Sequence, residues 1–357
     1  MTTSKQNPPT LAKSRKGLHP GVIVCFVLMG FVALLISSFL IWRFRLSSQM
    51  SARLSAIRNA GEPTTTRELD HYYAAVPEAE NAAVVWMKGL EKLNPPYDKN
   101  QPTAWGKIKL PERGRRLGEL QKASQILRDN EEAMKIFRTA ARTSKSRYKV
   151  DLSGGPSVEL PHLSAIKSAG SLLRLGALVA AQTGESDESA EAIRDVIGAA
   201  ESLRAEPLLI SQLVRFSLHS IAGLAAQSTL NLIPLQESKL AMLQKAFEEA
   251  EDKQSIYRAL VGERACSATY LLHPDQVPLP ALSADPQQDQ KRAGGIKGLI
   301  SPTMRMSGFF QRDGVFFLDA MATNLAVAQL PDPDRFKSRH AMDSLELKAR
   351  KGYYIMS

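Results

Sequence analysis

The feature that most constrains this chain is an uninterrupted apolar stretch near its N-terminus. Residues 21–42 read GVIVCFVLMGFVALLISSFLIW and contain no charged residue, no proline, no asparagine and no glutamine. With a rise of about 1.5 Å per residue, a helix of this length spans the roughly 30 Å hydrocarbon core of a bilayer. No other part of the chain has 18 uncharged apolar residues in a row, so the sequence predicts one transmembrane helix at 21–42.

A cleaved signal peptide is the main alternative to an anchor. Signal peptides have an apolar region of about 7–15 residues, followed by a cleavage site of small residues. Here the apolar region is longer, and Arg43, Phe44 and Arg45 follow it directly. We therefore expect an uncleaved single-pass anchor in the cell membrane. The basic residues that flank the span are almost equally divided, but a 20-residue basic tail is hard to export. We expect residues 1–20 to be cytoplasmic and the C-terminal domain extracytoplasmic.

The formal net charge of +10 is concentrated on both sides of this segment. Four basic residues and no acidic residue lie in the tail at 1–20, and the same is true of residues 43–60. Residues 61–357 therefore carry a net charge of only about +2. This distribution argues against nucleic-acid binding and points to the lipid bilayer as partner. The stem at 43–60 is either a site for anionic lipid headgroups or a plain solvated stalk.

Hydrophobic periodicity predicts an all-α fold for the rest of the chain. After the stem, an N-terminal helical subdomain at 61–145 and a linker at 146–160 precede a helical-hairpin domain at 161–357. In the subdomain, Thr65 and Glu68 predict a capping box for a short helix. Another helix is expected from Pro77 to about Leu93, and a further one from 112 to 144 that Asn130 interrupts.

Two consecutive α-hairpins are predicted in the second domain. The first joins helices at 161–182 and 186–203 through Thr183-Gly184-Glu185, with the acidic residues of its second helix away from the apolar stripe: Glu188, Glu191, Asp195 and Glu201. The helix at 207–230 is apolar on most faces, so we expect it to be central. Its partner follows at about 240–250. This order suggests a helical-repeat or solenoid-like layout. A long loop is expected at about 272–313, with helices at 314–330 and 335–351.

The sequence contains no recognisable catalytic, cofactor-binding or metal-binding constellation. Two cysteines cannot form a thiolate zinc site, and the phosphate-binding and nucleophile motifs are absent. Ser164 and Lys167 have the S-x-x-K spacing of acyl-transfer enzymes, but the other elements of those enzymes are missing. A solvated helix face produces the same spacing. We therefore predict no catalytic, cofactor or metal site.

One polar pair lies on the most apolar of the predicted helices. Arg215 and His219 are one turn apart, with Gln212 nearby. Because a buried charge is costly without a partner, an acid should reach Arg215, and Glu206 and Glu263 are the candidates. We interpret the pair as an internal polar clasp between helices. A ligand-binding or catalytic role is the alternative.

Several short motifs resemble a family of bacterial single-pass membrane-anchored helical proteins without known activity. They are Gly61-Glu62-Pro63, Tyr72-Tyr73, Pro77 with Glu80-Asn81-Ala82-Ala83, and Glu206-Pro207-Leu208 with Gln212-Leu213-Val214-Arg215. The resemblance covers about residues 50–355 and implies no site or cofactor. Longer proteins of that group continue past the point where this chain ends, and the sequence leaves open whether the chain is a shortened form.

Together these observations favour a membrane-anchored helical scaffold, or protein-interaction module, of the cell envelope with an unidentified protein partner. The alternative is an enzyme or ligand-binding protein whose dispersed site surrounds Arg215 and His219.

Overall fold

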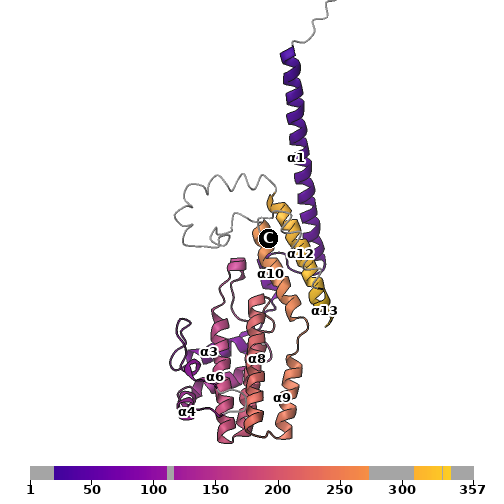
Figure 1. Ribbon diagram of the computed structural model, residues 1–357. Helices are drawn as coiled ribbons and strands as arrows, with labels where there is room; N and C mark the ends of the chain where they lie inside the picture. Colours follow the sequence, from indigo (N-terminus) through magenta and orange to yellow (C-terminus); the bar gives the residue numbers. More distant parts are fainter. Residues whose placement is uncertain (1–19, 111–115, 273–308, 332, 339–357) are drawn as a thin grey trace, which may run out of the picture. The chain divides into compact units, whose positions relative to one another are not determined.

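The computed structural model describes residues 20–110, 116–272, 309–331 and 333–338, and within these ranges the chain is helical and contains no strand (Figure 1). The all-α prediction is therefore confirmed for the described residues. The α-helices and the short 3-10 helices η1–η3 are α1 (Pro20–Asn59), α2 (Thr66–Tyr72), η1 (Glu78–Glu80), α3 (Ala82–Glu91), η2 (Trp105–Lys107), α4 (Leu120–Asp129), α5 (Glu131–Ala140), η3 (Leu152–Ser157), α6 (Pro161–Thr183), α7 (Ser186–Glu201), α8 (Leu209–Leu232), α9 (Glu237–Ala250), α10 (Ser255–Leu272), α12 (Phe309–Ala328) and α13 (Asp334–Lys337).

Helix α1 joins the apolar stretch and the basic stem in one continuous helix of 40 residues. Its large apolar side chains from Val22 to Trp42 are exposed in the described structure. The helix ends in a Schellman motif, in which Gly61 N–H donates to Arg58 O and Glu62 N–H donates to Ile57 O. Gly61 adopts φ 76°, a conformation that favours glycine. The sequence motif Gly61-Glu62-Pro63 is therefore the physical end of α1.

The base of α1 is packed against two later helices rather than fully solvated. Met50 and Leu54 are buried in a cluster with Ala268 of α10 and Leu318 of α12. The guanidinium group of Arg53 donates to the Asp319 carboxylate at 2.6 and 2.9 Å. Residues 50–57 are thus part of the helical domain, and the plain solvated stalk is wrong for this part of the stem.

Capping residues determine where the short helices after the stem begin. Thr65 Oγ1 accepts from Glu68 N–H, as the predicted capping box requires, but the Glu68 carboxylate binds Thr64 rather than Thr65. The helix predicted from Pro77 starts as η1, and α3 begins only at Ala82, because Asn81 caps it by accepting from Ala83 N–H. Asn130 separates α4 from α5, as the sequence predicts.

Helix α6, and not α8, is the central helix of the domain. Fourteen of its 23 residues are buried, and its apolar side chains belong to the main core. On α8, by contrast, the large apolar side chains of Ile210, Leu213, Leu224 and Leu230 are exposed, the first three of them on one side of the helix. The prediction that α8 is central was therefore wrong, because a helix that is apolar on most faces still leaves one face uncovered here.

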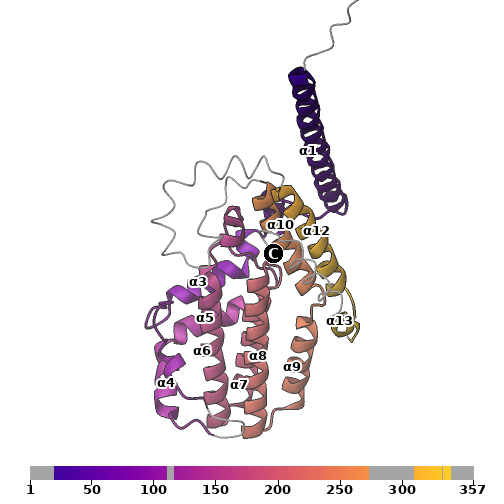
Figure 2. The same cartoon turned by 45° about the horizontal axis from the view of Figure 1, so that its top comes forward.

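Helices α6, α7, α8 and α9 run alongside one another (Figures 1 and 2). Helices α6 and α7 form the predicted hairpin around Gly184, α8 packs on both, and α9 packs mainly against α7. Ser189 of α7 donates to Ala177 O and shares a hydrogen bond with Thr229 of α8. This buried polar contact fixes the register of three helices.

The acidic side chains of α7, which the sequence places away from the apolar stripe, are not all exposed. Asp195 has only 1% of its side chain exposed, and its two oxygens are bound by Arg138 of α5 at 3.2 Å and by Arg142, just after α5, at 2.9 Å. Burial raises the pKa of Asp195, although both arginines oppose that shift. Helix α5 therefore covers the part of α7 that carries Asp195.

The remaining predicted segments are described only in part. Segment 146–160 contains the buried residues Tyr148 and Leu152, and one core cluster includes side chains from α3 to α9, so the division into subdomains stays a prediction. Most of the long loop expected at 272–313, namely 273–308, lies outside the described residues. Helix α12 begins at Phe309, earlier than predicted. Of the helix expected at 335–351, α13 covers the start, and residues 339–357, including the chain end, lie outside the described ranges.

Candidate functional site

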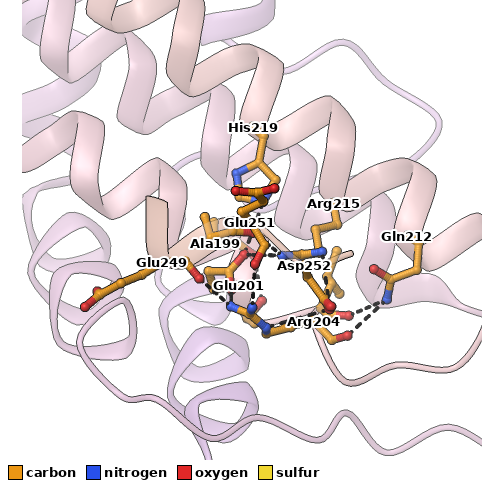
Figure 3. A network of polar contacts seen from close by, with 12 residues as sticks. Ala199, Glu201, Arg204, Gln212, Arg215, His219, Glu249, Glu251 and Asp252 are labelled. Atoms are coloured by element: carbon orange, nitrogen blue, oxygen red, sulfur yellow. Dashed lines mark hydrogen bonds and ion pairs between the residues drawn. The ribbon is translucent and has the colours of Figure 1, made fainter. Parts of the chain in front are cut away.

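The polar pair singled out in the sequence lies where α7 ends beside α8. Arg215 is 1% exposed, and His219 follows one turn later with 21% of its side chain exposed. The spacing of three and four residues places Gln212, Arg215 and His219 on one side of α8. Figure 3 shows that all three point toward the end of α7 and the segment after α9.

The acid that reaches Arg215 is Glu201, the last residue of α7. Arg215 donates to Glu201 Oε1 from Nη2 at 2.8 Å and from Nε at 3.1 Å, and to Ala250 O at 2.7 Å. Its Nη1 lies 3.9 Å from Asp252. The prediction of Glu206 or Glu263 was wrong, because Glu206 binds His162 and Ser211, whereas Glu263 accepts from Leu209 N–H.

Glu201 is surrounded by three basic side chains. His219 Nε2 lies 3.1 Å from Glu201 Oε1, and Arg204 Nη1 donates to Oε2 at 2.5 Å. Burial acts to raise the pKa of Glu201, but His219 and the guanidinium groups of Arg215 and Arg204 outweigh it, so the pKa is lowered. Glu201 is therefore held as a carboxylate and is a poor proton donor near neutral pH.

A second carboxylate, Asp252, joins the segment after α9 to this cluster. Arg258 Nη1 binds Asp252 Oδ2 at 3.0 Å, and Gln254 N–H donates to Oδ1 at 3.0 Å. Burial opposes ionisation of Asp252, but the contact with Arg258 outweighs it and lowers the pKa. Arg204 also donates to the carbonyl oxygens of Glu249 and Glu251. We call Glu201, Arg204, Arg215, His219 and Asp252 the polar clasp.

Gln212 closes the other end of the polar clasp. Its Nε2 donates to the backbone oxygens of Leu203, Arg204 and Glu206, which form the connection between α7 and α8. The dashed contacts in Figure 3 join this connection to the end of α9. The clasp therefore joins three segments, namely the connection between α7 and α8, helix α8 itself and the end of α9.

One side of the polar clasp faces a cavity of about 980 Å³. Its walls come from α8, from the end of α9 and the turn after it, and from the segment after α12. The side chains that line it include Arg215, Phe216, His219, Phe247, Asp252, Lys253, Ile256, Leu330 and Arg335. This cavity is large enough for a small molecule, and of the clasp residues that line it His219 has the largest exposed fraction, 21%.

The geometry favours a structural clasp over a catalytic centre. Arg215 binds two acceptors, and Glu201 has a lowered pKa, so neither is poised to exchange a proton. Within the described ranges, no group of three or more histidine, cysteine, aspartate or glutamate side chains is placed to hold a metal ion. Ser164 and Lys167, the S-x-x-K pair, are both exposed on α6, and Ser164 Oγ donates to Pro161 O at 3.4 Å.

Sequence reasoning found the centre of the clasp but missed Glu201, Arg204 and Asp252. The sequence places Glu201 only away from the apolar stripe of its helix, because the helical pattern does not show that α8 lies beside the end of α7. Asp252 lies in a turn, where periodicity carries no information. No family model, curated protein or solved structure matches this chain.

Proposed function

We propose that this protein is a single-pass membrane protein whose helical domain serves as a scaffold or protein-interaction module of the cell envelope. The observation that carries the membrane part is the exposed apolar surface of α1. A run of large apolar side chains from Val22 to Trp42 is unfavourable in water, and a bilayer is the environment that satisfies it.

Two other helices have the length and composition to cross a membrane, but their surroundings differ. In the most apolar stretch of α6, 67% of the residues are buried within the domain, and in that of α8 the share is 33%. The corresponding stretch of α1 is 0% buried. Helices α6 and α8 also carry Lys167, Arg174 and Arg215. These differences support one span, at residues 21–42.

The orientation and the lipid contacts complete this proposal. Residues 1–20, of which 1–19 lie outside the described ranges, are the cytoplasmic tail, and the domain is extracytoplasmic. Arg53 and Arg58 are paired with Asp319 and Glu68. Binding of anionic headgroups by the stem is therefore assigned to the part of α1 nearest the apolar stretch, where Arg45 lies, with about 1 kcal/mol for each basic residue.

The scaffold role is supported by the order of the helices and by the uncovered face of α8. Helix α8 packs on both helices of the α6–α7 hairpin and α9 packs on α7, so successive helices are layered side by side, as they are in short helical repeats. Ile210, Leu213 and Leu224 are 50%, 50% and 41% exposed on one side of α8. Helical repeats use such surfaces to bind protein partners. The charged side chains of the polar clasp pair with one another, so they do not need a partner molecule to neutralise them.

Two variants of matched charge test the two parts of this proposal separately. Leu28→Arg/Leu35→Arg adds two charges to the apolar stretch, at a cost of about 2.5–3.5 kcal/mol each at the centre of a span. Leu213→Arg/Leu224→Arg adds the same charge to α8. We expect the first variant to become extractable by alkaline carbonate, and the second to stay in the membrane fraction like the unmodified chain. Equal extraction of all three proteins contradicts the anchor.

The interaction part is tested with a photo-crosslinking residue at Leu213, and with a control residue at the exposed Ser238. We expect the Leu213 probe to give a discrete crosslinked product in intact cells, and the additional change Leu224→Arg to remove that product. The scaffold role is overturned by crosslinking at Leu213 that equals the Ser238 control.

A ligand-binding role at the polar clasp is the second candidate, favoured by the accessible His219 on the wall of the 980 Å³ cavity. Calorimetric titration with acetate and with inorganic phosphate tests it. Binding that His219→Gln abolishes supports this role, whereas absence of binding at millimolar concentration for both anions counts against it.

A further inference from the structure

A second cavity, of about 660 Å³, lies away from the polar clasp. It is formed by the end of α3, the segment at 96–100, the segment at 148–149 and the start of α6. Its walls are mostly apolar and include Met87, Leu90, Pro96, Tyr97, Pro161 and Ala165. At its edge, Lys99 and Lys149 are balanced by Glu91 and Asp98. The cavity therefore has the size of a small-molecule site, and its formal charge selects neither an anion nor a cation.

The most unusual side chain that lines this cavity is His162, at the start of α6. It is 5% exposed, and its ring stacks on Tyr148 with centroids 4.3 Å apart and an interplanar angle of 15°. Its Nε2 lies 3.0 Å from Oε2 and 3.2 Å from Oε1 of Glu206, a residue with 0% exposure. A histidine is thus held between an aromatic ring and a fully buried acid, and it reaches the cavity.

The partners of Glu206 determine which nitrogen of His162 carries the proton. Ser211 Oγ donates to Glu206 Oε1 at 2.6 Å, so this carboxyl group acts as an acceptor. His162 Nε2 is then the donor to Glu206, and in a neutral imidazole Nδ1 carries the lone pair. Nδ1 makes no hydrogen bond within the described residues. The contact with Glu206 therefore selects, for a neutral His162, the tautomer in which Nδ1 is an acceptor that no described residue pairs.

We propose that this cavity is a binding site for a small, largely apolar molecule with one hydroxyl group, of the phenol class. The ring of such a ligand is matched to the walls formed by Met87, Leu90 and Tyr97, and its O–H donates to His162 Nδ1. A hydrogen bond in an apolar cavity discriminates well between ligands with and without a donor, because a ligand without the donor leaves Nδ1 buried and unpaired. The site does not depend on the polar clasp or on the scaffold role.

The probe pair 4-fluorophenol and 4-fluoroanisole tests this assignment, because the two share a fluorinated ring and only the first can donate. Binding is measured by ¹⁹F line broadening on the full chain in nanodiscs, with protein-free nanodiscs as the reference for partition into lipid. We expect the phenol to bind about fivefold to tenfold more tightly than the anisole, the difference that one hydrogen bond supplies.

His162→Gln is the decisive variant. The terminal amide nitrogen of glutamine occupies about the same place as histidine Nε2, so it can still donate to Glu206, but nothing replaces the acceptor at Nδ1. We expect the preference for the phenol to fall to about one. His71→Gln, a change at an exposed histidine, is the matched control and should keep the full preference. Circular dichroism and thermal melting check that both variants are folded.

A second variant keeps the test decisive if His162→Gln does not fold. Ala165 lines the cavity from α6, and Ala165→Leu fills part of the space without touching the His162–Glu206 contact. We expect this change to weaken both probes by at least about fivefold. The proposal is overturned if the unmodified protein binds both probes equally or neither, if folded His162→Gln keeps the preference, or if Ala165→Leu leaves both affinities unchanged.

Discussion

Arg215 on α8 donates two hydrogen bonds, at 2.8 and 3.1 Å, to the same carboxylate oxygen of Glu201 at the end of α7. The two members of this pair differ in burial, since the Arg215 side chain is 1% exposed and that of Glu201 is 25% exposed. Glu201 also has two other basic neighbours, whereas Arg215 has only the distant Asp252 as a second acid. Removal of one partner should therefore change the unfolding free energy by a different amount than removal of the other.

This asymmetry predicts the order of two stability changes. Glu201→Gln leaves the buried Arg215 charge without its main partner and should cost about 3 kcal/mol of unfolding free energy. Arg215→Met leaves Glu201 paired with Arg204 and His219 and should cost about 1 kcal/mol. The double variant should lose less than the sum of the two. Urea unfolding measures all three, and a larger loss for Arg215→Met than for Glu201→Gln would falsify the order.

The pH dependence of stability follows from the lowered pKa of Glu201. Because the pKa in the folded state is below the ordinary value of 4.5, the unfolded chain binds this proton more readily. The stabilisation from Glu201 is therefore complete above about pH 4.5 and is lost as the pH falls through the lower folded-state pKa. Below pH 4.5 we expect the difference in unfolding free energy between the unmodified chain and Glu201→Gln to shrink. A difference that stays constant down to pH 3 contradicts this assignment.

Protonation of Asp195 at low pH should change the stability in the opposite direction to protonation of Glu201. Its folded-state pKa is raised above the ordinary value of 3.8, so its ionisation on burial opposes folding. As the pH falls through the raised pKa, protonation of Asp195 in the folded state should offset part of the unfolding free energy that is lost when other acids are protonated. We expect Asp195→Asn to remove this offset, as measured by urea unfolding across pH 3–6. An unchanged pH profile would show that Asp195 does not titrate in this range.

Two glycines on neighbouring helices should respond in opposite ways to alanine. A Cβ at Gly262 on α10 would lie 1.6 Å from Pro207 O, so the backbone must move. We expect Gly262→Ala to cost about 3 kcal/mol. On α8, a Cβ at Gly223 meets nothing within 4 Å, and Gly223→Ala should stabilise the protein by about 0.5–1 kcal/mol. Thermal unfolding of the two variants checks the prediction, and destabilisation of similar size in both is the contrary result.

Cys266 should report on unfolding rather than on membrane topology. It is 1% exposed on α10, and burial raises the pKa of its thiol to about 12. In a Cys25→Ser background, we expect maleimide to label Cys266 at least about 100-fold faster in urea than in the folded state, since only an exposed thiolate reacts. A cysteine engineered at the exposed Ser238, in a chain without native cysteines, is the suitable topology probe. Fast labelling of Cys266 without urea would contradict the described packing of α10.

What the sequence by itself determined is local. The apolar stretch at 21–42, the cap at Thr65, the interruption at Asn130 and the turn at Gly184 depend on neighbouring residues, and all appear in the structure as the sequence predicts. Periodicity also identified Arg215 and His219 as polar residues on an apolar helix. These features can be predicted without the tertiary structure, because a helix end or an uncharged run has the same chemistry in almost any tertiary context.

Only the tertiary structure decided which faces are covered and which charges meet. Hydrophobic periodicity marks an apolar face but does not say whether another helix lies on it, so it predicts α8 as the central helix, whereas α6 has that place in the structure. The partner of Arg215 depends on where α7 ends against α8, and this placed Glu201 rather than Glu206 beside it. Glu206 instead holds His162 from a position 44 residues away. Contacts between distant segments are set by helix packing, and no short-range pattern in the sequence contains that information.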